Sequence, residues 1–388
     1  MNAAEHKKHA DLARPSLGNF GRNEWAVLGT PCPAIKKLSE DIIAALSISY
    51  KCAYVDAAHV KEGQPALLPG RLAAGAFAEY ADKINHHEFV FNKKFNAFGF
   101  REVLQDADLI LVNGNHQQAK SQVVVIDKVK EASLKRKLNQ LTDVQLFLLT
   151  EGETTIFDFL KEAIPKWEKI PVFSLQEKDK IVDFFRNKME CAIPKINGLV
   201  LAGGKSLRFG SDKGMINWHG KVQREYVAEL LQPFCKEVFI SCREEQQAEL
   251  NGNFQSVTDT FTDLGPYGAI LSAFRKQPDA AWLVVACDLP LLDTNVLKFL
   301  VEHRNHSSIA TTFQSPHDGL PEPLITIWEP KSYQMLLSFL SQGFSCPRKV
   351  LINSDATILQ PPFPDALMNV NTQEEFQKAK ALLGLETK

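Results

Sequence analysis

Short runs of apolar residues alternate along the chain with segments in which apolar residues recur every three or four positions. The runs have the length of strands that are buried on both faces, and the periodic segments have the pattern of amphipathic helices. The first series of predicted strands covers residues 24–29, 51–57, 107–114, 121–127, 143–150 and 170–175. The helices predicted in the same series cover residues 34–47, 131–141 and 178–188.

A second series follows, and it repeats the same alternation. Its predicted strands cover residues 196–204, 237–242, 254–259, 281–288, 308–313 and 323–328, with helices that include 224–234 and 294–304. The two series predict an α/β protein of two doubly wound three-layer domains, the second with a mostly parallel sheet. We expect a tail over residues 1–20, a first domain over 21–190 and a second over 195–388, joined through 188–197.

The composition narrows the class of protein. Hydrophobic residues make up 45% of the 388 residues and charged residues 23%, which excludes fibrous and disordered chains. The formal net charge of −2 gives no sign of a nucleic-acid partner, so an anionic substrate has to be met by a local cluster of cations.

The cysteines and the N-terminal residues indicate the cellular compartment in which we expect the protein. The seven cysteines are scattered and contain no CxxC pair, so we expect reduced and mostly buried thiols. Residues 1–16 lack the apolar core of a signal peptide, and no apolar stretch is long enough to cross a membrane. We therefore expect a cytoplasmic protein without a membrane partner.

Residues 199–214, LVLAGGKSLRFGSDKG, place a glycine-rich turn directly after a predicted strand. Gly203 and Gly204 allow a tight turn that can direct backbone N–H groups towards an anion. Arg208 and Lys213 are near enough in sequence to reach the same polyphosphate. The loop is neither a dinucleotide fingerprint nor a Walker-type loop, and the alternative interpretation is a glycine turn with solvated cations.

Two aspartates end other predicted strands of the second series. Asp288 follows the strand at 281–288 and suits Mg²⁺, which binds one or two carboxylates together with waters and phosphate oxygens. The alternative is a helix cap, but Asp293 is better placed for that role. Asp259 ends another strand, and Gly265 and Gly268 follow in a loop suited to close approach by a ligand.

The motifs LAGGKSLRFGSDKG, DLGPYGAI, CDLP, PEPL and MNVNTQEE, in this order, resemble the molybdenum cofactor guanylyltransferase branch of the nucleotidyltransferases. The resemblance covers about half of the chain, from Ile196 to the last predicted helix. It implies a nucleotidyltransferase fold that transfers GMP from GTP to the terminal phosphate of molybdopterin, releases pyrophosphate and uses Mg²⁺. Molybdoenzymes are possible partners.

The resemblance also implies roles for particular residues. Arg208, Lys213 and Asp288 are the implied catalytic residues, and Asp288 is the implied metal ligand. Asn369 and Asn371 are implied on the pterin side, near a loop around Glu322 and Pro323. The implied nucleotide-binding residues lie at the strand ends: Leu201, Ala202, Gly203, Gly204, Lys213, Asp259, Gly268 and Asp288.

Departures from the family pattern keep alternatives open. Cys242 and Arg243 follow a strand where the family often has an asparagine before an arginine or a similar residue. The PEPL segment also occurs in cytidylyltransferases that act on the same pterin. The alternatives are therefore transfer of CMP or a sugar phosphate, or a non-catalytic molybdopterin carrier or scaffold.

The first series resembles the GTP-binding molybdopterin-guanine dinucleotide adaptor protein. Residues 28–43 have the context of a phosphate-binding loop, but Ala34, Ile35 and Lys36 stand where that motif needs Gly, Lys and Ser or Thr. We therefore expect a degenerate P-loop-like domain that does not hydrolyse GTP. Polar residues at its strand ends are Asp56, His59, Asn113, Asn115 and His116. In a domain without hydrolysis, we expect Lys36 and Lys37 to be solvated charges on the first helix turn, and His59 and His116 to be ordinary polar loop residues.

Overall fold

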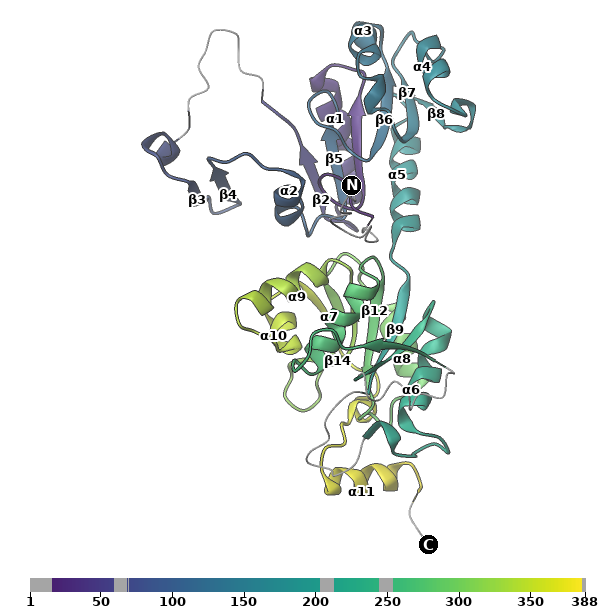
Figure 1. The fold of residues 1–388 in the computed structure, drawn as a ribbon. Coiled ribbons are helices and arrows are strands. Elements are labelled where there is room, and N and C mark those ends of the chain that lie inside the picture. Colours follow the sequence, from purple (N-terminus) through teal and green to yellow (C-terminus); the bar gives the residue numbers. More distant parts are fainter. Residues whose placement is uncertain (1–15, 59–67, 69, 203–212, 244–253, 386–388) are drawn as a thin grey trace, which may run out of the picture. The chain divides into compact units, whose positions relative to one another are not determined.

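The computed structural model describes residues 16–58, 68, 70–202, 213–243 and 254–385 of the chain (Figure 1). The described chain divides into two compact units, a first unit of residues 16–192 and a second unit that begins at residue 193. Each unit has its own central sheet and its own hydrophobic cores.

A six-stranded sheet lies at the centre of the first unit, in the order β2-β5-β1-β6-β7-β8. All neighbouring strands in this sheet are parallel. Its strands are β1 (Glu24–Leu28), β2 (Cys52–Val55), β5 (Leu109–Asn113), β6 (Ser121–Ile126), β7 (Val144–Leu149) and β8 (Val172–Ser174). Their carboxyl ends therefore meet at one edge of the sheet.

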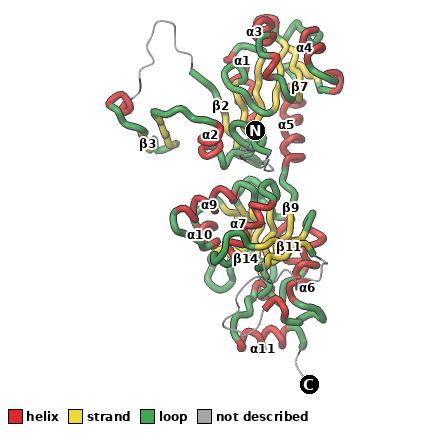
Figure 2. Tube along the Cα trace, in the orientation of Figure 1, coloured by secondary structure: helices red, strands yellow, loops and turns green. Residues whose placement is uncertain are grey.

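Helices cover both faces of this sheet (Figure 2). Trp25 and Val27 of β1 pack with α1 and α5, whereas Leu28 packs with α3 and α4, because successive strand residues point to opposite faces. The helices are α1 (Cys32–Leu46), α2 (Ala97–Val103), α3 (Glu131–Lys135), α4 (Asp158–Ala163) and α5 (Lys178–Ala192), with 3-10 turns η2 (Lys128–Lys130), η3 (Leu138–Gln140) and η4 (Trp167–Lys169).

The first unit also contains an antiparallel hairpin that the hydrophobic pattern does not predict. Strands β3 (Ala78–Asp82) and β4 (His87–Phe91) follow the 3-10 turn η1 (Gly70–Ala74) and form a separate two-stranded sheet. Many of their side chains are exposed, and ring contacts such as that of Tyr80 with Phe89 join the two strands. Because neither face is covered, no buried stripe marks these strands in the sequence.

The second unit is built on a seven-stranded sheet in the order β11-β10-β9-β12-β14-β13-β15. Strands β11, β10, β9 and β12 are parallel neighbours, and β14 is antiparallel to both β12 and β13. The strands are β9 (Ile196–Leu201), β10 (Val238–Cys242), β11 (Gln255–Thr258), β12 (Ala281–Ala286), β13 (Ala310–Gln314), β14 (Pro321–Trp328) and β15 (Ala356–Leu359).

Two cores lie on the two faces of this sheet. Val200 packs with α6 and α8, and its neighbour Leu199 packs with α7, α9 and α10 on the other face (Figure 1). The helices are α6 (Gln223–Leu231), α7 (Pro266–Lys276), α8 (Thr294–Glu302), α9 (Ser332–Ser341), α10 (Pro347–Ile352) and α11 (Gln373–Leu382), with 3-10 turns η5 (Lys213–Met215), η6 (Gln232–Phe234) and η8 (Pro364–Leu367).

The α/β class, the layered architecture and the mostly parallel second sheet are confirmed. Three local features differ from the prediction. Helix α5 extends to Ala192, beyond its predicted end at residue 188, and the boundary between the two units follows Ala192, within the expected join of 188–197. Strand β15 is absent from the prediction because it is short and only half-buried. Strand β14 begins at Pro321, so the PEPL segment is strand and not loop.

Candidate active site

The carboxyl ends of four parallel strands form one edge of the second sheet. Leu201, the last residue of β9, is in register with Ser241 of β10 and Ala286 of β12. Cys242 of β10 is in register with Thr258 of β11. Residues that directly follow these strands therefore lie along one line, and the span from β11 to β12 is three strand spacings, or roughly 14 Å. This length suits an extended nucleotide.

Part of the predicted nucleotide loop lies outside the described residues, namely Gly203, Gly204 and Arg208. Ala202, just after β9, is buried, and Leu201 is half-buried. The backbone of Lys213 opens the 3-10 turn η5. The described residues thus define the two ends of the loop.

Asp288 lies two residues beyond the end of β12 and is half-buried. Its neighbours Cys287 and Leu289 are buried in the core with α6 and α8. The backbone N–H of Val370 donates a hydrogen bond of 2.9 Å to the carbonyl oxygen of Asp288. The turn that carries this carboxylate is therefore anchored on both sides and from a distant segment.

Two side chains that the sequence analysis did not select bind the same turn. Gln223, the first residue of α6, is buried and donates from Nε2 to the carbonyl oxygen of Leu289 at 3.3 Å. The Nε2 atom of His219 lies 2.9 Å from the carbonyl oxygen of Pro290. No local motif marks these residues, because their role comes from contacts with a turn far along the chain.

Asp293 caps helix α8. It accepts a hydrogen bond from the backbone N–H of Val296 at 3.0 Å, as the sequence predicts. Asp293 therefore caps α8, and Asp288, five residues earlier, is not needed as the cap of this helix.

The segment before α11 reaches the turn at Asp288. Met368 and Val370 are buried in a small core with Trp218, whereas Asn369 is half-buried and Asn371 is exposed. Because Val370 bonds to Asp288, its two asparagine neighbours are brought to the same edge of the sheet.

Asp259 follows β11 at the other end of this edge. Its Oδ1 atom accepts a hydrogen bond of 3.1 Å from the hydroxyl of Ser241. Burial raises the pKa of the Asp259 carboxyl, and the Ser241 hydroxyl and the Arg243 charge act in the opposite direction. Burial and the Asp259 charge raise the pKa of the nearby Cys242 thiol, and the Arg224 charge acts in the opposite direction. Arg224 is buried and adds a cation that the sequence analysis did not select.

The two glycines at the start of α7 differ in what surrounds them. A Cβ on Gly268 would lie 2.1 Å from the carbonyl oxygen of Phe261, so packing requires glycine there. Gly265 has a φ of +55° and open space around its Cβ position, and its carbonyl accepts the N–H of Ala269. At the start of α7, the backbone therefore has free space beside it at Gly265, whereas neighbouring atoms leave no room for a side chain at Gly268.

Glu322 also lies at this edge, because β14 runs antiparallel to β12 and starts beside its carboxyl end. Glu322 is buried, and its Oε1 atom lies 3.4 Å from Nη2 of Arg348. Arg348 also donates to Asp318 at 2.7 Å. Pairing with Arg348 compensates the buried charge of Glu322.

Whether this edge of the sheet suits a divalent metal depends on the side chains that could act as its ligands. No group of three or more His, Cys, Asp or Glu side chains suited to a metal occurs within the described ranges. Mg²⁺ does not need such a group, because one or two carboxylates with waters and phosphate oxygens complete its shell. The half-buried carboxylate of Asp288, two residues beyond the end of β12, the strand next to β9, fits this requirement.

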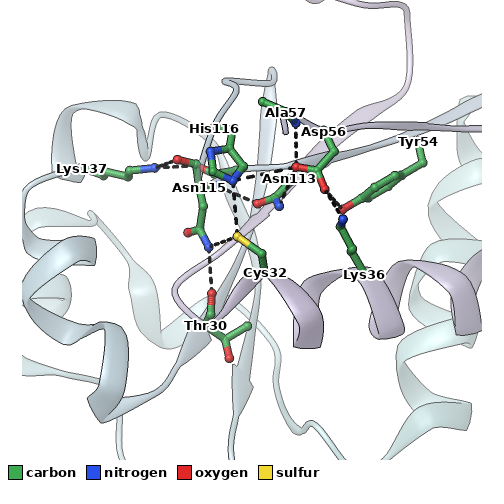
Figure 3. Close-up of polar contacts among 11 residues, drawn as sticks. Thr30, Cys32, Lys36, Tyr54, Asp56, Ala57, Asn113, Asn115, His116 and Lys137 are labelled. Atoms are coloured by element: carbon green, nitrogen blue, oxygen red, sulfur yellow. Dashed lines mark hydrogen bonds and ion pairs between the residues drawn. The ribbon is translucent and has the colours of Figure 1, made fainter. Parts of the chain in front are cut away.

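A second polar cluster lies at the carboxyl edge of the first sheet (Figure 3). Asp56 follows β2 and accepts hydrogen bonds from Tyr54 and Asn113 at 3.1 and 2.9 Å. Lys36 lies 3.4 Å from the same carboxylate. Burial raises the pKa of Asp56, but the Ala57 N–H and these side chains outweigh it and hold the pKa below its usual range.

This cluster adds contacts that the sequence does not predict for the first unit. His116 lies in the turn after β5, as expected of a loop residue, but its side chain is only 15% exposed, and its Nε2 atom lies 3.3 Å from Sγ of Cys32. Lys36 and Lys37 are more exposed, as predicted, although each pairs with a carboxylate, Asp56 and Asp41 respectively. His59 lies outside the described residues.

The cysteines and the helix lengths complete this description. All seven cysteines are free, but only Cys242 and Cys287 are buried, so the expectation of mostly buried thiols is wrong. Across the part of the chain that the structure describes, every helix is too short or too polar to cross a membrane.

Comparison with known proteins gives a match over the second unit. Residues 198–357 match the MobA-like NTP transferase domain. The "Molybdenum cofactor biosynthesis bifunctional protein" of Synechocystis sp. is 30% identical over 198 residues, which are 51% of this chain and 57% of that protein. The "Molybdenum cofactor guanylyltransferase" of a Shewanella species is 28% identical over 195 residues, 48% of this chain and 96% of that protein.

A solved structure, that of molybdopterin-guanine dinucleotide biosynthesis protein A from Archaeoglobus fulgidus, covers 49% of this chain and all of its own. It is 22% identical with a TM-score of 0.42. The second unit is therefore similar to the MobA-like NTP transferase domain over residues 198–357, and the chain spans 57% of the length of the bifunctional relative.

Proposed function

We propose that this chain transfers GMP from GTP to the terminal phosphate of molybdopterin, with pyrophosphate as the second product. The MobA-like NTP transferase domain supports nucleotidyl transfer, and the names of the curated relatives support molybdenum cofactor biosynthesis. The match spans only 57% of the bifunctional relative, so the proposal concerns the transferase domain.

The observation that carries this proposal is the hydrogen bond of 2.9 Å between Val370 N–H and the carbonyl oxygen of Asp288. In our proposal Asp288 serves the triphosphate, and Asn369 and Asn371 serve the pterin. The bond therefore holds the segment proposed to bind the pterin against the turn proposed to bind the triphosphate. Such positioning is what the transfer requires, because two substrates have to be aligned for attack at the α-phosphorus.

The proposed chemistry needs no strong general base, because the attacking group is already a phosphate anion. Its oxygen forms a bond to the α-phosphorus of GTP while the bond between the α-phosphorus and the bridging oxygen to the β-phosphate breaks. Negative charge then accumulates on pyrophosphate. Arg208 and Lys213 neutralise this charge in our proposal, and catalysis comes from positioning and electrostatic stabilisation.

Asp288 is the residue proposed to hold Mg²⁺. Bound Mg²⁺ supplies positive charge that neutralises the phosphate oxygens and orients them. Leu201, Ala202 and the glycine turn after them are proposed to bind the nucleotide, with Asp259 at the nucleoside end. The pairing of Ser241 with Asp259 fixes the direction of that carboxylate.

We propose that residues 195–388 are the catalytic domain and that residues 21–190 form an adaptor-like domain that does not hydrolyse GTP. Ile35 stands where the motif has its lysine, and the neighbouring cation, Lys36, lies 3.4 Å from Asp56. Asp56 also accepts bonds from Tyr54 and Asn113, so an internal carboxylate compensates the charge near the start of α1. GTP hydrolysis by a chain whose transferase is inactivated, lost with Lys36→Ala, would contradict this assignment.

The test is pyrophosphate release by the full chain with GTP, CTP, ATP or UTP, each with Mg²⁺, in the presence and absence of molybdopterin. We expect turnover with GTP that depends on the pterin. Turnover with CTP alone would mean that CMP is transferred by the same mechanism. CMP transfer is the alternative to test because Cys242 and Arg243 stand at the end of β10, where the family often has an asparagine before an arginine or a similar residue. Tight pterin binding without turnover on any nucleotide would support a carrier in place of an enzyme.

A further inference from the structure

The β1–α1 connection of the first unit holds a cysteine beside a histidine. Cys32 is the first residue of α1, a helix of 15 residues, and it is half-buried. His116 comes from the segment after β5, which is the neighbour of β1 in the sheet. Sγ of Cys32 and Nε2 of His116 are 3.3 Å apart, which is hydrogen-bond distance for sulfur (Figure 3).

Each partner of this pair is held by further groups. Nε2 of His116 also lies 3.9 Å from Oδ1 of Asp56, whose side chain is 16% exposed. The side-chain amide of Asn115 donates to the carbonyl oxygen of Thr30 at 2.9 Å and lies 3.6 Å from the Cys32 sulfur. A nucleophile with a base within hydrogen-bond reach is the arrangement of an activated thiol, and the nearby Asp56 carboxylate favours the protonated imidazole that forms when His116 takes the thiol proton.

Charged side chains from several segments of the first unit lie around Cys32. Lys137 donates to the carbonyl oxygens of Gly114 and Asn115 at 2.9 and 2.6 Å, and its charge interacts with Cys32. Burial lowers the pKa of Lys137, while Cys32 acts in the opposite direction. The α1 N-terminus adds partial positive charge at the sulfur. The titratable groups that face the pair are His116, Lys137, Lys36, Asp56 and Tyr54.

We propose that Cys32 and His116 form a nucleophile–base pair, and that Cys32 is a redox modification site which a small hydroperoxide converts to the sulfenic acid. This site is separate from the transferase chemistry of the second unit, and nothing in the proposed function requires it. The reactive class is a small peroxide because the thiol is half-buried and side chains surround it on several sides.

The reaction balances with the groups present and one peroxide. The thiol proton moves to Nε2 of His116, and the thiolate sulfur attacks one peroxide oxygen. An S–O bond forms and the O–O bond breaks, so sulfur is oxidised and the peroxide is reduced. The leaving hydroxide of hydrogen peroxide, or the alkoxide of an organic hydroperoxide, takes the proton from His116 and departs as water or the alcohol, which returns the imidazole to its neutral form.

The full chain contains its own reference thiols for a test. Cys191 and Cys346 are exposed, and burial raises the pKa of the Cys52 thiol to about 11. Alkylation by iodoacetamide is followed for each cysteine by peptide mass spectrometry between pH 5 and pH 10. We expect the midpoint for Cys32 to lie at least one pH unit below that of the exposed thiols, which is about tenfold more thiolate at pH 6.5. After hydrogen peroxide, we expect dimedone to label Cys32.

A matched pair of histidine variants separates the proposed base from general effects. His116→Asn should move the Cys32 midpoint up towards that of Cys191, whereas His87→Asn, in the exposed hairpin, should leave it unchanged. A wild-type Cys32 profile that coincides with the exposed thiols, or a Cys32 that is not alkylated, overturns the proposal. An unchanged profile in a folded His116→Asn variant overturns the pair.

Discussion

The amide of Val370 donates a hydrogen bond of 2.9 Å to the carbonyl oxygen of Asp288, and this bond joins the segment before α11 to the turn after β12. The donor belongs to a buried residue between two accessible asparagines, and the acceptor belongs to the proposed metal-binding residue. Backbone pairing of this kind fixes position without using a side chain. The side chains of Asn369, Asn371 and Asp288 remain the groups proposed to meet substrates.

Two aspartates of one connection should respond differently to the same substitution. Asp288→Asn is expected to reduce pyrophosphate release by about a hundredfold or more, because charge compensation at the phosphates is lost. Asp293→Asn keeps a side-chain acceptor for Val296, and Asp293→Ala should lower the free energy of unfolding by about 1 kcal/mol with transfer retained. Equal losses of transfer in both positions would contradict the assignment of Asp288.

The Gln223 side chain is expected to support the turn next to Asp288. Gln223→Leu leaves the buried carbonyl of Leu289 without this donor and should lower the free energy of unfolding by about 1–3 kcal/mol. We expect kcat to fall more than KM rises, because the turn is displaced and the substrates still bind. Gln255→Leu on the exposed edge strand is the control, and its kinetics should match the parent chain. Chemical denaturation and steady-state pyrophosphate release measure the two effects.

Asp259 should make stability depend on pH in a defined direction. Burial raises its pKa in the folded state, so the folded chain holds this proton more tightly than the unfolded chain. The contribution of the neutral carboxyl is present below the unfolded pKa of about 3.9 and is lost as pH rises through the raised folded pKa. Asp259→Asn should therefore raise Tm at pH 7 relative to the parent.

The advantage of Asp259→Asn should shrink as the pH is lowered towards 4, and thermal unfolding at several pH values follows it. A Tm difference that stays constant across this range would show that the carboxyl is not the source. Ser241→Ala removes the hydroxyl that favours the charged form, so it should enlarge the destabilisation at pH 7.

For Gly268→Ala, the direction of the change in stability distinguishes the effect of packing from that of helix propensity. Glycine to alanine in a helix normally stabilises by up to about 1 kcal/mol. At Gly268 a Cβ would approach the carbonyl oxygen of Phe261 to 2.1 Å, so Gly268→Ala should destabilise by about 1–3 kcal/mol. Calorimetry compares the variant with the parent, and a raised Tm would contradict the packing argument.

The hydrophobic pattern predicts the elements that the cores require. Strands such as β1, β9 and β12 are buried along most or all of their length, so their apolar runs are visible without any knowledge of neighbours. The hairpin of β3 and β4 and the edge strand β15 are not predicted, because exposed or half-buried strands depend on pairing that leaves little local pattern.

The sequence by itself predicted two layered α/β units and placed Asp259 and Asp288 at strand ends, since a residue that follows a buried strand can be identified locally. Only the tertiary structure decided which distant residues meet: Val370 with Asp288, and Cys32 with His116, which are 84 residues apart. Strand order and the paths of the loops set these contacts. Periodicity reports how each segment is buried, and it carries no information about which segment lies beside it.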